Sequence, residues 1–156
     1  MIILAKKVKT YQLKVPSSTD QLEIIREFVT GVARKVGFRE DELNKIELAV
    51  DEASTNVVKH AYAYDDRKPI EIQLRVEPDR FVIQITDKGK GFKPEQVKKP
   101  DMKEYLAKMR VGGLGIYLMK TMMDEVEFSI DPGRKNRVRM VKYITPETVH
   151  PTRKVS

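Results

Sequence analysis

The sequence predicts an α+β fold of two layers, in which helices cover one face of a mostly antiparallel sheet. Two amphipathic helical patterns follow one another in the first half of the chain, over residues 22–36 and 41–63. Two hairpin patterns come later, at residues 70–87 and 126–144. Helices grouped in this way, with strands joined as hairpins, favour one helical layer packed on an antiparallel sheet.

The chain is expected to start with a strand over residues 6–15. A helix follows over residues 22–36, because its hydrophobic residues recur at steps of three and four. Asp20 and Glu23 have the spacing of a capping box at the start of this helix. Gly37 is the residue type that commonly ends a helix.

The second helix, over residues 41–63, carries two stripes. The hydrophobic stripe is expected to face the core and consists of Leu43, Ile46, Val50, Ala53 and Val57. The other stripe consists of Glu52, Asn56 and His60, which recur at steps of four. A carboxylate, a carboxamide and an imidazole in this array can supply a base, a neutral ligand for a hard cation and a phosphate contact. The alternative for these residues alone is a polar stripe that faces solvent.

The first hairpin is predicted from the alternation over residues 70–76 and the hydrophobic residues of 81–86. Its second strand ends in Asp87-x-Gly89-x-Gly91. An Asp at the tip of a buried strand can accept a hydrogen bond from an exocyclic amine, and glycines let a ligand approach the backbone. A tight turn after a strand is the alternative for this motif alone.

Residues 93–111 form a connection that is long for such a small domain, which is typical of lids and binding loops. The loop is rich in lysine, so we interpret it as a cationic lid over a polyphosphate; a solvated, partly helical insertion is the alternative. Gly112-Gly113-Leu114-Gly115 follows and leads into a helical pattern over residues 114–123. Glycine-rich backbone at a helix N-terminus binds anions through free N–H groups and the helix dipole. It is not a P-loop, because no Lys-Ser or Lys-Thr pair follows.

The last two strands are predicted at residues 126–130 and 138–144, around a turn at residues 131–133. The methionines of the preceding helix are expected in the core. We expect one domain over residues 1–145, followed by a basic, flexible tail over residues 146–156.

Composition narrows the class of protein. The chain has 156 residues, of which 40% are hydrophobic and 34% charged, as expected of a globular domain. It has no cysteine, so it forms neither disulfides nor thiolate metal sites. The net charge of +7 is concentrated in residues 134–156, whereas a DNA-binding protein would more often spread its basic residues over a helix, with polar readers among them. This segment has no aromatic residue apart from Tyr143 for stacking on single strands, so we expect no direct nucleic-acid binding. No apolar run suits a signal peptide or a membrane span, and we expect a cytoplasmic protein that does not bind membranes.

Taken together, the three motifs resemble the N, G1 and G2 boxes of one ATP-binding fold: Glu52-x-x-x-Asn56-x-x-x-His60, Asp87-x-Gly89-x-Gly91 and Gly113-Leu114-Gly115. This fold, of the Bergerat type, is shared by gyrase, the ninety-kilodalton heat-shock chaperones, histidine kinases and MutL. The compact chain and the segments at residues 50–53 and 122–126 most resemble bacterial anti-sigma factor serine kinases. The resemblance covers residues 8–144.

The resemblance implies how the phosphoryl group would be transferred. Glu52 would be the base that takes the proton from the attacking hydroxyl. Asn56 would coordinate a Mg²⁺ ion that bridges the phosphates of ATP, and Arg110 would reach the γ-phosphate from the lid. These roles agree with the general demands of phosphoryl transfer, which are positioning, a metal ion and cations around the developing charge.

The resemblance also implies which residues bind ATP. Asp87 would bind the adenine amine in a pocket that is shaped by Gly89 and Gly91. The implied contacts with the phosphates come from His60, Gly113, Leu114 and Gly115.

Kinases of this kind phosphorylate a serine of an anti-anti-sigma partner, bind and silence a sigma factor, and usually form homodimers. The sequence departs from their pattern twice. Val111 replaces the usual Arg before the Gly-Gly pair, and Gly133-Arg134-Lys135-Asn136 replaces the usual Gly-x-Gly-Thr. These departures favour one alternative, a nucleotide-gated binding switch of the same fold with little or no kinase activity. The second alternative is a nucleic-acid binder that uses the basic C-terminal end.

Overall fold

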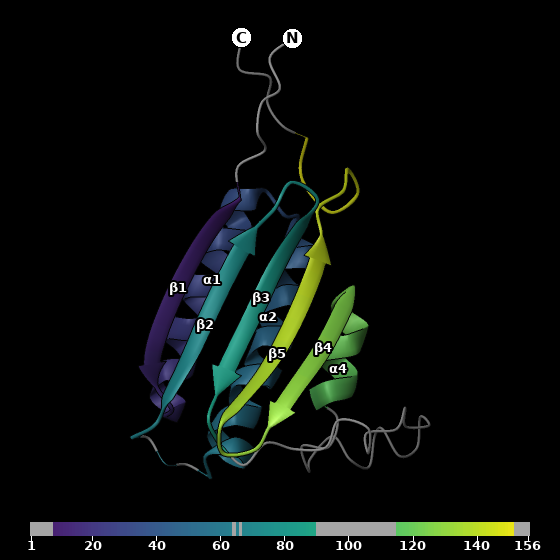
Figure 1. The fold of residues 1–156 in the computed structure, drawn as a ribbon. Coiled ribbons are helices and arrows are strands. Elements are labelled where there is room, and N and C mark those ends of the chain that lie inside the picture. The colour runs from purple at the N-terminus through teal and green to yellow at the C-terminus, as the bar shows by residue number, and fades with distance from the viewer. Residues whose placement is uncertain (1–7, 64, 66, 90–114, 152–156) are drawn as a thin grey trace, which may run out of the picture.

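The computed structural model describes residues 8–63, 65, 67–89 and 115–151. In this part of the chain, a five-stranded sheet is covered on one face by helices (Figure 1). The predicted two-layer α+β fold is therefore confirmed. All neighbouring strands in this sheet are antiparallel.

The sheet has the strand order β1-β2-β3-β5-β4. The strands are β1 (Lys9–Pro16), β2 (Pro69–Val76), β3 (Arg80–Asp87), β4 (Glu125–Asp131) and β5 (Lys135–Tyr143). The two predicted hairpins are β2–β3 and β4–β5, and they join because β5 pairs with β3. As a result the end of β3 lies beside the start of β5, where Asp87 is opposite Asn136.

The helical layer is built from α1, α2 and α4, with two short turns. The bounds are η1 (Thr19–Gln21, 3-10), α1 (Leu22–Val36), α2 (Glu40–Asn56), η2 (Val57–Ala61, π-helical) and α4 (Gly115–Met122). As predicted, α1 ends at Gly37, whose φ of 103° lies in the left-handed region that favours glycine. None of the helices in the described residues is long and apolar enough to span a membrane.

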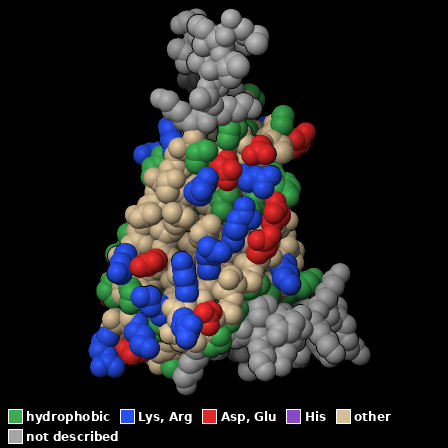
Figure 2. Space-filling view, in the orientation of Figure 1, with side chains coloured by type: hydrophobic (Ala, Val, Ile, Leu, Met, Phe, Trp, Pro, Cys, Tyr) green, Lys and Arg blue, Asp and Glu red, His purple; other side chains and the backbone are tan. Residues whose placement is uncertain are grey.

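One hydrophobic core lies between the helices and the sheet. Side chains that are fully buried there include Ile25, Ile46, Ile72, Leu74, Ile83, Met119 and Met140. Met119 and Met123 are core residues, as expected for the methionines of this segment. No described helix covers the opposite face of the sheet, where positive and negative side chains are interspersed (Figure 2). A shallow groove of about 400 Å³ on that face is lined by residues that include Gln12, Gln73, Gln84 and Arg137.

Two local predictions are wrong. Asp20 and Glu23 do not form a capping box, because a 3-10 turn precedes α1 and its N-cap, Gln21, makes no side-chain cap hydrogen bond. The Ser18 hydroxyl donates to the Asp20 carboxylate instead. The last strand begins at Lys135 and not at residue 138, so Asn136 belongs to the sheet.

The C-terminal segment is bound to the domain over more residues than we expected. The backbone N–H of Arg39 donates to Thr148 O at 2.9 Å, and that of His150 donates to Gly37 O at 2.9 Å. Val149 pairs with Phe38 in an isolated bridge. The expectation of a flexible tail over residues 146–156 is thus corrected for residues 148–150, and residues 152–156 lie outside the described part of the chain.

Candidate functional site

The described residues of the three motifs meet at one end of the two layers, which is the lower end in Figure 1. The carboxyl end of α2, the end of β3 and the starts of β5 and α4 lie there, with α2 packed against α4. This arrangement follows from the topology, because β5 pairs with β3, and α4, which precedes β4 in the chain, packs beside α2 in the helical layer (Figure 1).

Gly115, the first residue of α4, lies directly against the polar stripe of α2. A Cβ atom at Gly115 would be 2.9 Å from Glu52 Oε2 and 3.3 Å from Asn56 Nδ2. Any side chain at this position would have to displace one of these two groups. The backbone at the start of α4 therefore forms one site with the Glu52 carboxylate and the Asn56 amide.

The Glu52 carboxyl is half-buried at this point. Burial raises its pKa above the ordinary value for a carboxyl group, and the neighbouring Asp51 carboxylate raises it further, whereas Lys59 lowers it. A raised pKa strengthens a carboxylate as a base, because the pKa is closer to the pH at which it must accept a proton.

Asp51, the residue before Glu52, is engaged elsewhere. The guanidinium of Arg26 on α1 donates from Nε to both of its carboxylate oxygens, at 3.0 and 3.1 Å. Asp51 therefore joins α1 to α2, and it acts on Glu52 only through its charge.

Gly89 lies so close to another part of the backbone that there is no space for a side chain. A Cβ atom at Gly89 would be 2.2 Å from the carbonyl oxygen of Ala61 in the π-helical turn η2. We predicted glycine here so that a ligand could approach, but the close neighbour in the structure is Ala61. Gly89 thus lets η2, which follows α2, pack against the end of β3.

Asp87 is held by a small hydrogen-bond network and is 7% exposed. Its Oδ1 accepts from the backbone N–H of Gly89 at 2.8 Å and from Nδ2 of Asn136 at 2.9 Å. Nδ2 of Asn136 also donates to Gly89 O at 2.8 Å, and the N–H of Gly133 donates to the same oxygen at 2.7 Å. The network fixes the Asp87 carboxylate relative to the β4–β5 turn.

A small cavity lies inside these elements. Its polar lining comes from Asn56, Asp87 and Asn136, and hydrophobic side chains such as Ile85 and Met119 complete it. Its volume of about 20 Å³ suits a group of the size of one water molecule. A polar group that enters this cavity would meet oxygen and amide atoms in otherwise apolar surroundings.

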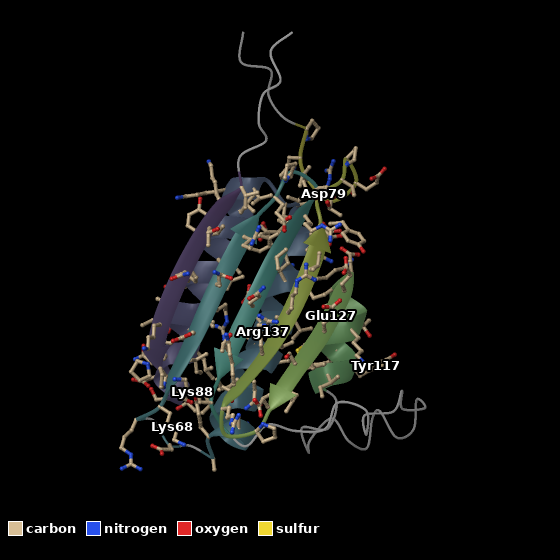
Figure 3. The ribbon with its side chains drawn as sticks, in the orientation of Figure 1. Lys68, Asp79, Lys88, Tyr117, Glu127 and Arg137 are labelled. Carbon is tan, nitrogen blue, oxygen red and sulfur yellow. The ribbon has the colours of Figure 1, made fainter. Side chains whose placement is uncertain are left out.

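Tyr62 connects the start of β2 with the residue that follows β3 through hydrogen bonds of its hydroxyl group. Its hydroxyl donates to Pro69 O at 2.9 Å and accepts from the backbone N–H of Lys88 at 2.7 Å. Burial raises the pKa of the phenol, which keeps this donor protonated. Lys68 lies over the ring, with Nζ 5.6 Å from its centre, and Figure 3 shows Lys68 and Lys88 at the same end of the molecule. Tyr62 is thus a structural residue beside the site.

Several predicted site residues lie outside the described part of the chain. These are Gly91, Arg110, Gly113 and Leu114, together with the lid over residues 93–111. The side chain of His60 is also not described, although its backbone belongs to η2. The site described above thus consists of Glu52, Asn56, Asp87, Gly89 and Gly115 from the prediction.

Asn136 belongs to this group of residues although it was not among the predicted site residues. We noted it only as a departure from a family pattern, because the last strand was expected to begin two residues later. Alternation contained a signal: Val138 and Met140 face the core, so Asn136 lies on the same face of β5.

The chain is similar to known proteins in sequence. Residues 15–142 match the family described as the histidine kinase-like ATPase domain. The chain is 38% identical to the serine-protein kinase RsbW of Bacillus subtilis (strain 168), over 88% of each chain. It is also 38% identical to RsbW of Bacillus pumilus (strain SAFR-032), over 91% of this chain and 90% of that protein.

Solved structures with the same fold are more distant in sequence. One contains the RsbU and RsbW domains of a Mycobacterium tuberculosis protein; it has a TM-score of 0.64 at 13% identity and covers 95% of this chain and 35% of that chain. Another is the SiaB–SiaC complex from Pseudomonas aeruginosa, with a TM-score of 0.63 at 14% identity, covering 84% of this chain and 88% of that chain. At these identities the likeness concerns the fold alone.

Proposed function

The chain belongs to the RsbW serine-protein kinases, whose domain is a histidine kinase-like ATPase domain that binds ATP, and we propose how its own residues carry out the transfer. ATP lies across the end of the helical layer where α2, β3 and α4 meet. Its adenine points toward Asp87, and its phosphates lie between Asn56 and Gly115. The γ-phosphoryl group is then close to Glu52.

The phosphate end of this proposal is supported by the start of α4. Backbone N–H groups in the first turn of a helix have no partners within the helix, and the helix dipole is positive there. Gly115 brings this helix end against Asn56 without a side chain in between. An anionic phosphate next to Gly115 would therefore be stabilised by backbone as well as by the amide.

The proposal includes a Mg²⁺ ion, for which Asn56 would be the protein ligand. The described residues hold no cluster of three or more His, Asp or Glu side chains suited to a metal. Mg²⁺ in nucleotide sites takes most of its ligands from phosphates and water, so one neutral amide oxygen fits this use. The ion would neutralise charge on the phosphates, and Asn56 would hold it beside them without adding negative charge.

Glu52 is proposed as the base. The serine hydroxyl of the substrate gives its proton to the Glu52 carboxylate as its oxygen attacks the γ-phosphorus and the bond to ADP breaks. The half-buried position and the raised pKa of Glu52 suit this step. The observation that supports the proposal is the closeness of Gly115 to both Glu52 and Asn56, since a Cβ there would be 2.9 Å from Glu52 Oε2 and 3.3 Å from Asn56 Nδ2.

The test compares two variants, with ATP binding and phosphoserine formation measured separately. Glu52→Ala should abolish transfer and leave the affinity for Mg·ATP within a few fold. Asn56→Ala should weaken Mg·ATP binding itself. Transfer at the wild-type rate by Glu52→Ala would refute the base assignment. Binding of ATP by the wild type without transfer to any partner would favour the nucleotide-gated switch.

The partners are part of the proposal as well. By its family resemblance, the protein phosphorylates a serine of an anti-anti-sigma factor, binds a sigma factor and forms a homodimer in the cytoplasm. A solved protein of the same fold occurs in a complex with a second protein, SiaB with SiaC, which supports a fold that docks partners. Light scattering on the purified chain, alone and with each candidate partner, would measure both assemblies. A monomeric mass at every concentration would contradict the dimer.

A further inference from the structure

The orientation of the Asn136 side-chain amide is fixed by its neighbours. Its Nδ2 lies 2.9 Å from Asp87 Oδ1 and 2.8 Å from Gly89 O. Both neighbours are hydrogen-bond acceptors, so the nitrogen of the amide must face them. The carbonyl oxygen of the amide, Oδ1, therefore faces away from Gly89 O and from Oδ1 of Asp87.

That oxygen has no hydrogen-bond partner among the described residues, although Asn136 is only 2% exposed. Buried carbonyl oxygens are rarely left without a donor. Asn136 lines the small cavity next to Asp87 and Asn56, and much of the remaining lining is apolar, as at Met119. The cavity thus offers a buried acceptor with space for one small donor group, either a water molecule or an amino group.

We propose that Asn136 is a specificity-determining residue for the nucleobase, whose Oδ1 accepts one N–H of the exocyclic amine of adenine while the Asp87 carboxylate accepts the other. The inference rests on the proposed adenine site at Asp87. An amino group with two N–H donors satisfies both acceptors. A 6-keto purine presents an oxygen at the same place, which both acceptors repel.

Asn136 has a second, structural function that the experiment must separate from this one. Its Nδ2 orients Asp87 and joins Gly89 to β5. A truncated side chain will therefore weaken nucleotide binding for either reason. Varying the ligand separates the two, because N6-methyl-ATP has one amine N–H where ATP has two.

The test is calorimetric titration of the full chain with Mg·ATP, Mg·N6-methyl-ATP and Mg·ITP. The wild type should bind ATP roughly fivefold or more tightly than N6-methyl-ATP, the amount expected for one hydrogen bond. In Asn136→Ala, ATP affinity should fall and the ratio between the two nucleotides should approach one. Discrimination against ITP should fall as well. Gln84→Ala, on the opposite face of the neighbouring strand β3, is the matched control and should keep the wild-type ratios.

An equal loss of affinity for ATP and N6-methyl-ATP in Asn136→Ala would overturn the inference and leave Asn136 a structural residue. Asn136→Ser is the second variant if the first does not fold, and the same ratio decides. Equal binding of ATP and N6-methyl-ATP by the wild type would overturn the inference without any variant. The proposed function fails separately, if the wild type binds no adenine nucleotide or if Asp87→Asn binds ATP as tightly as the wild type.

Discussion

At the scale of residues, the site depends on how α2 sets the ionisation of Glu52. Its carboxyl is half-buried between an anionic neighbour, Asp51, and a cationic one, Lys59. Burial is the larger cause of its raised pKa, and the two charges act in opposite directions. The two neighbours therefore allow the pKa of the proposed base to be moved both ways without changing the base itself.

The first prediction is a pair of opposite shifts in the pH dependence of kcat/KM. Glu52 must be deprotonated to accept a proton, so activity falls as the pH drops through its raised pKa. Asp51→Asn removes a charge that raises this pKa, so the acidic limb should move to lower pH. Lys59→Gln removes a charge that lowers it, so the limb should move to higher pH.

The control for these shifts is Asp41→Asn, an exposed change in the first turn of the same helix, which should leave the limb in place. Because Asp51 is also bonded to Arg26, the stability of Asp51→Asn has to be checked at each pH. Shifts of the same sign in both variants would contradict the assignment of the limb to Glu52.

Individual residues also differ in whether the sequence could predict that they belong to the site. Helical periodicity identified Glu52 and Asn56, since a step of four holds within α2. It could not place Asn136, because membership of the site depends on β5 pairing with β3, a contact far apart in the sequence. Sequence patterns also could not predict why a glycine is needed at position 89, since its close neighbour Ala61 lies on another element.

At the scale of elements, the site requires close packing of η2 on the end of β3. The second prediction concerns this contact. Gly89→Ala places a Cβ 2.2 Å from Ala61 O, and neither backbone can move away easily. We expect a loss of about 1–3 kcal/mol in the free energy of unfolding, typical of overpacking, together with weaker ATP binding. Urea denaturation and calorimetric titration measure the two effects.

Gly31→Ala is the matched change for this prediction. Gly31 is exposed inside α1, and a Cβ there meets nothing within 4 Å. Alanine should therefore stabilise the protein by roughly 0.5–1 kcal/mol through its better helix propensity, with ATP affinity unchanged. If both glycine variants behave alike, the contact between Gly89 and Ala61 does not limit the fold.

The third prediction concerns the Tyr62 hydroxyl, which links the chain after η2 to the end of β3. Tyr62→Phe leaves Pro69 O and the N–H of Lys88 without this partner, so we expect a loss of about 1–3 kcal/mol in the free energy of unfolding. Tyr143→Phe removes an exposed hydroxyl that bonds to Glu125 and should change stability by less than about 0.5 kcal/mol. Similar losses in urea denaturation of the two variants would argue against a special role for Tyr62.

Elements with strong periodicity were predictable almost to their ends, and α1 with its C-cap at Gly37 is the best example. Predictions failed where local signals compete. At the start of α1, Ser18 bonds to Asp20, and a 3-10 turn replaces the expected capping box. At the start of β5 the residues are polar, and the strand extends there because Asn136 pairs with Asp87 of β3 and Lys135 pairs with Asp131 of β4.

At the scale of the whole molecule, the two layers are joined at the end opposite the site by a buried ion pair. Nζ of Lys142 on β5 lies 2.7 Å from Oε2 of Glu42 on α2, with 5% and 12% of the side chains exposed. The same Nζ donates to Met122 O at the end of α4, also at 2.7 Å. One ammonium group thus connects the sheet with the two helices whose other ends form the site. The alternation of hydrophobic and polar residues that predicted the strands could not predict this ion pair, because a lysine in a strand is normally expected to be exposed to solvent.

The fourth prediction is that this pair matters far more for stability than for nucleotide binding. Lys142→Met leaves Oε2 of the buried Glu42 carboxylate without its cation, while Lys45 remains 3.4 Å from Oε1. We therefore expect a loss of about 3 kcal/mol in the free energy of unfolding, the lower end of the range for a broken buried pair. Glu42→Leu combined with Lys142→Met removes both charges and should recover much of the loss, because buried ion pairs are often replaceable by well-packed hydrophobic residues. In the double variant, ATP affinity should stay near the wild-type value, since Glu52, Asn56 and Asp87 lie at the other end of the layers. A stable double variant that has lost ATP binding would show instead that the Lys142 link sets the position of α4 against α2, and with it the geometry around Gly115.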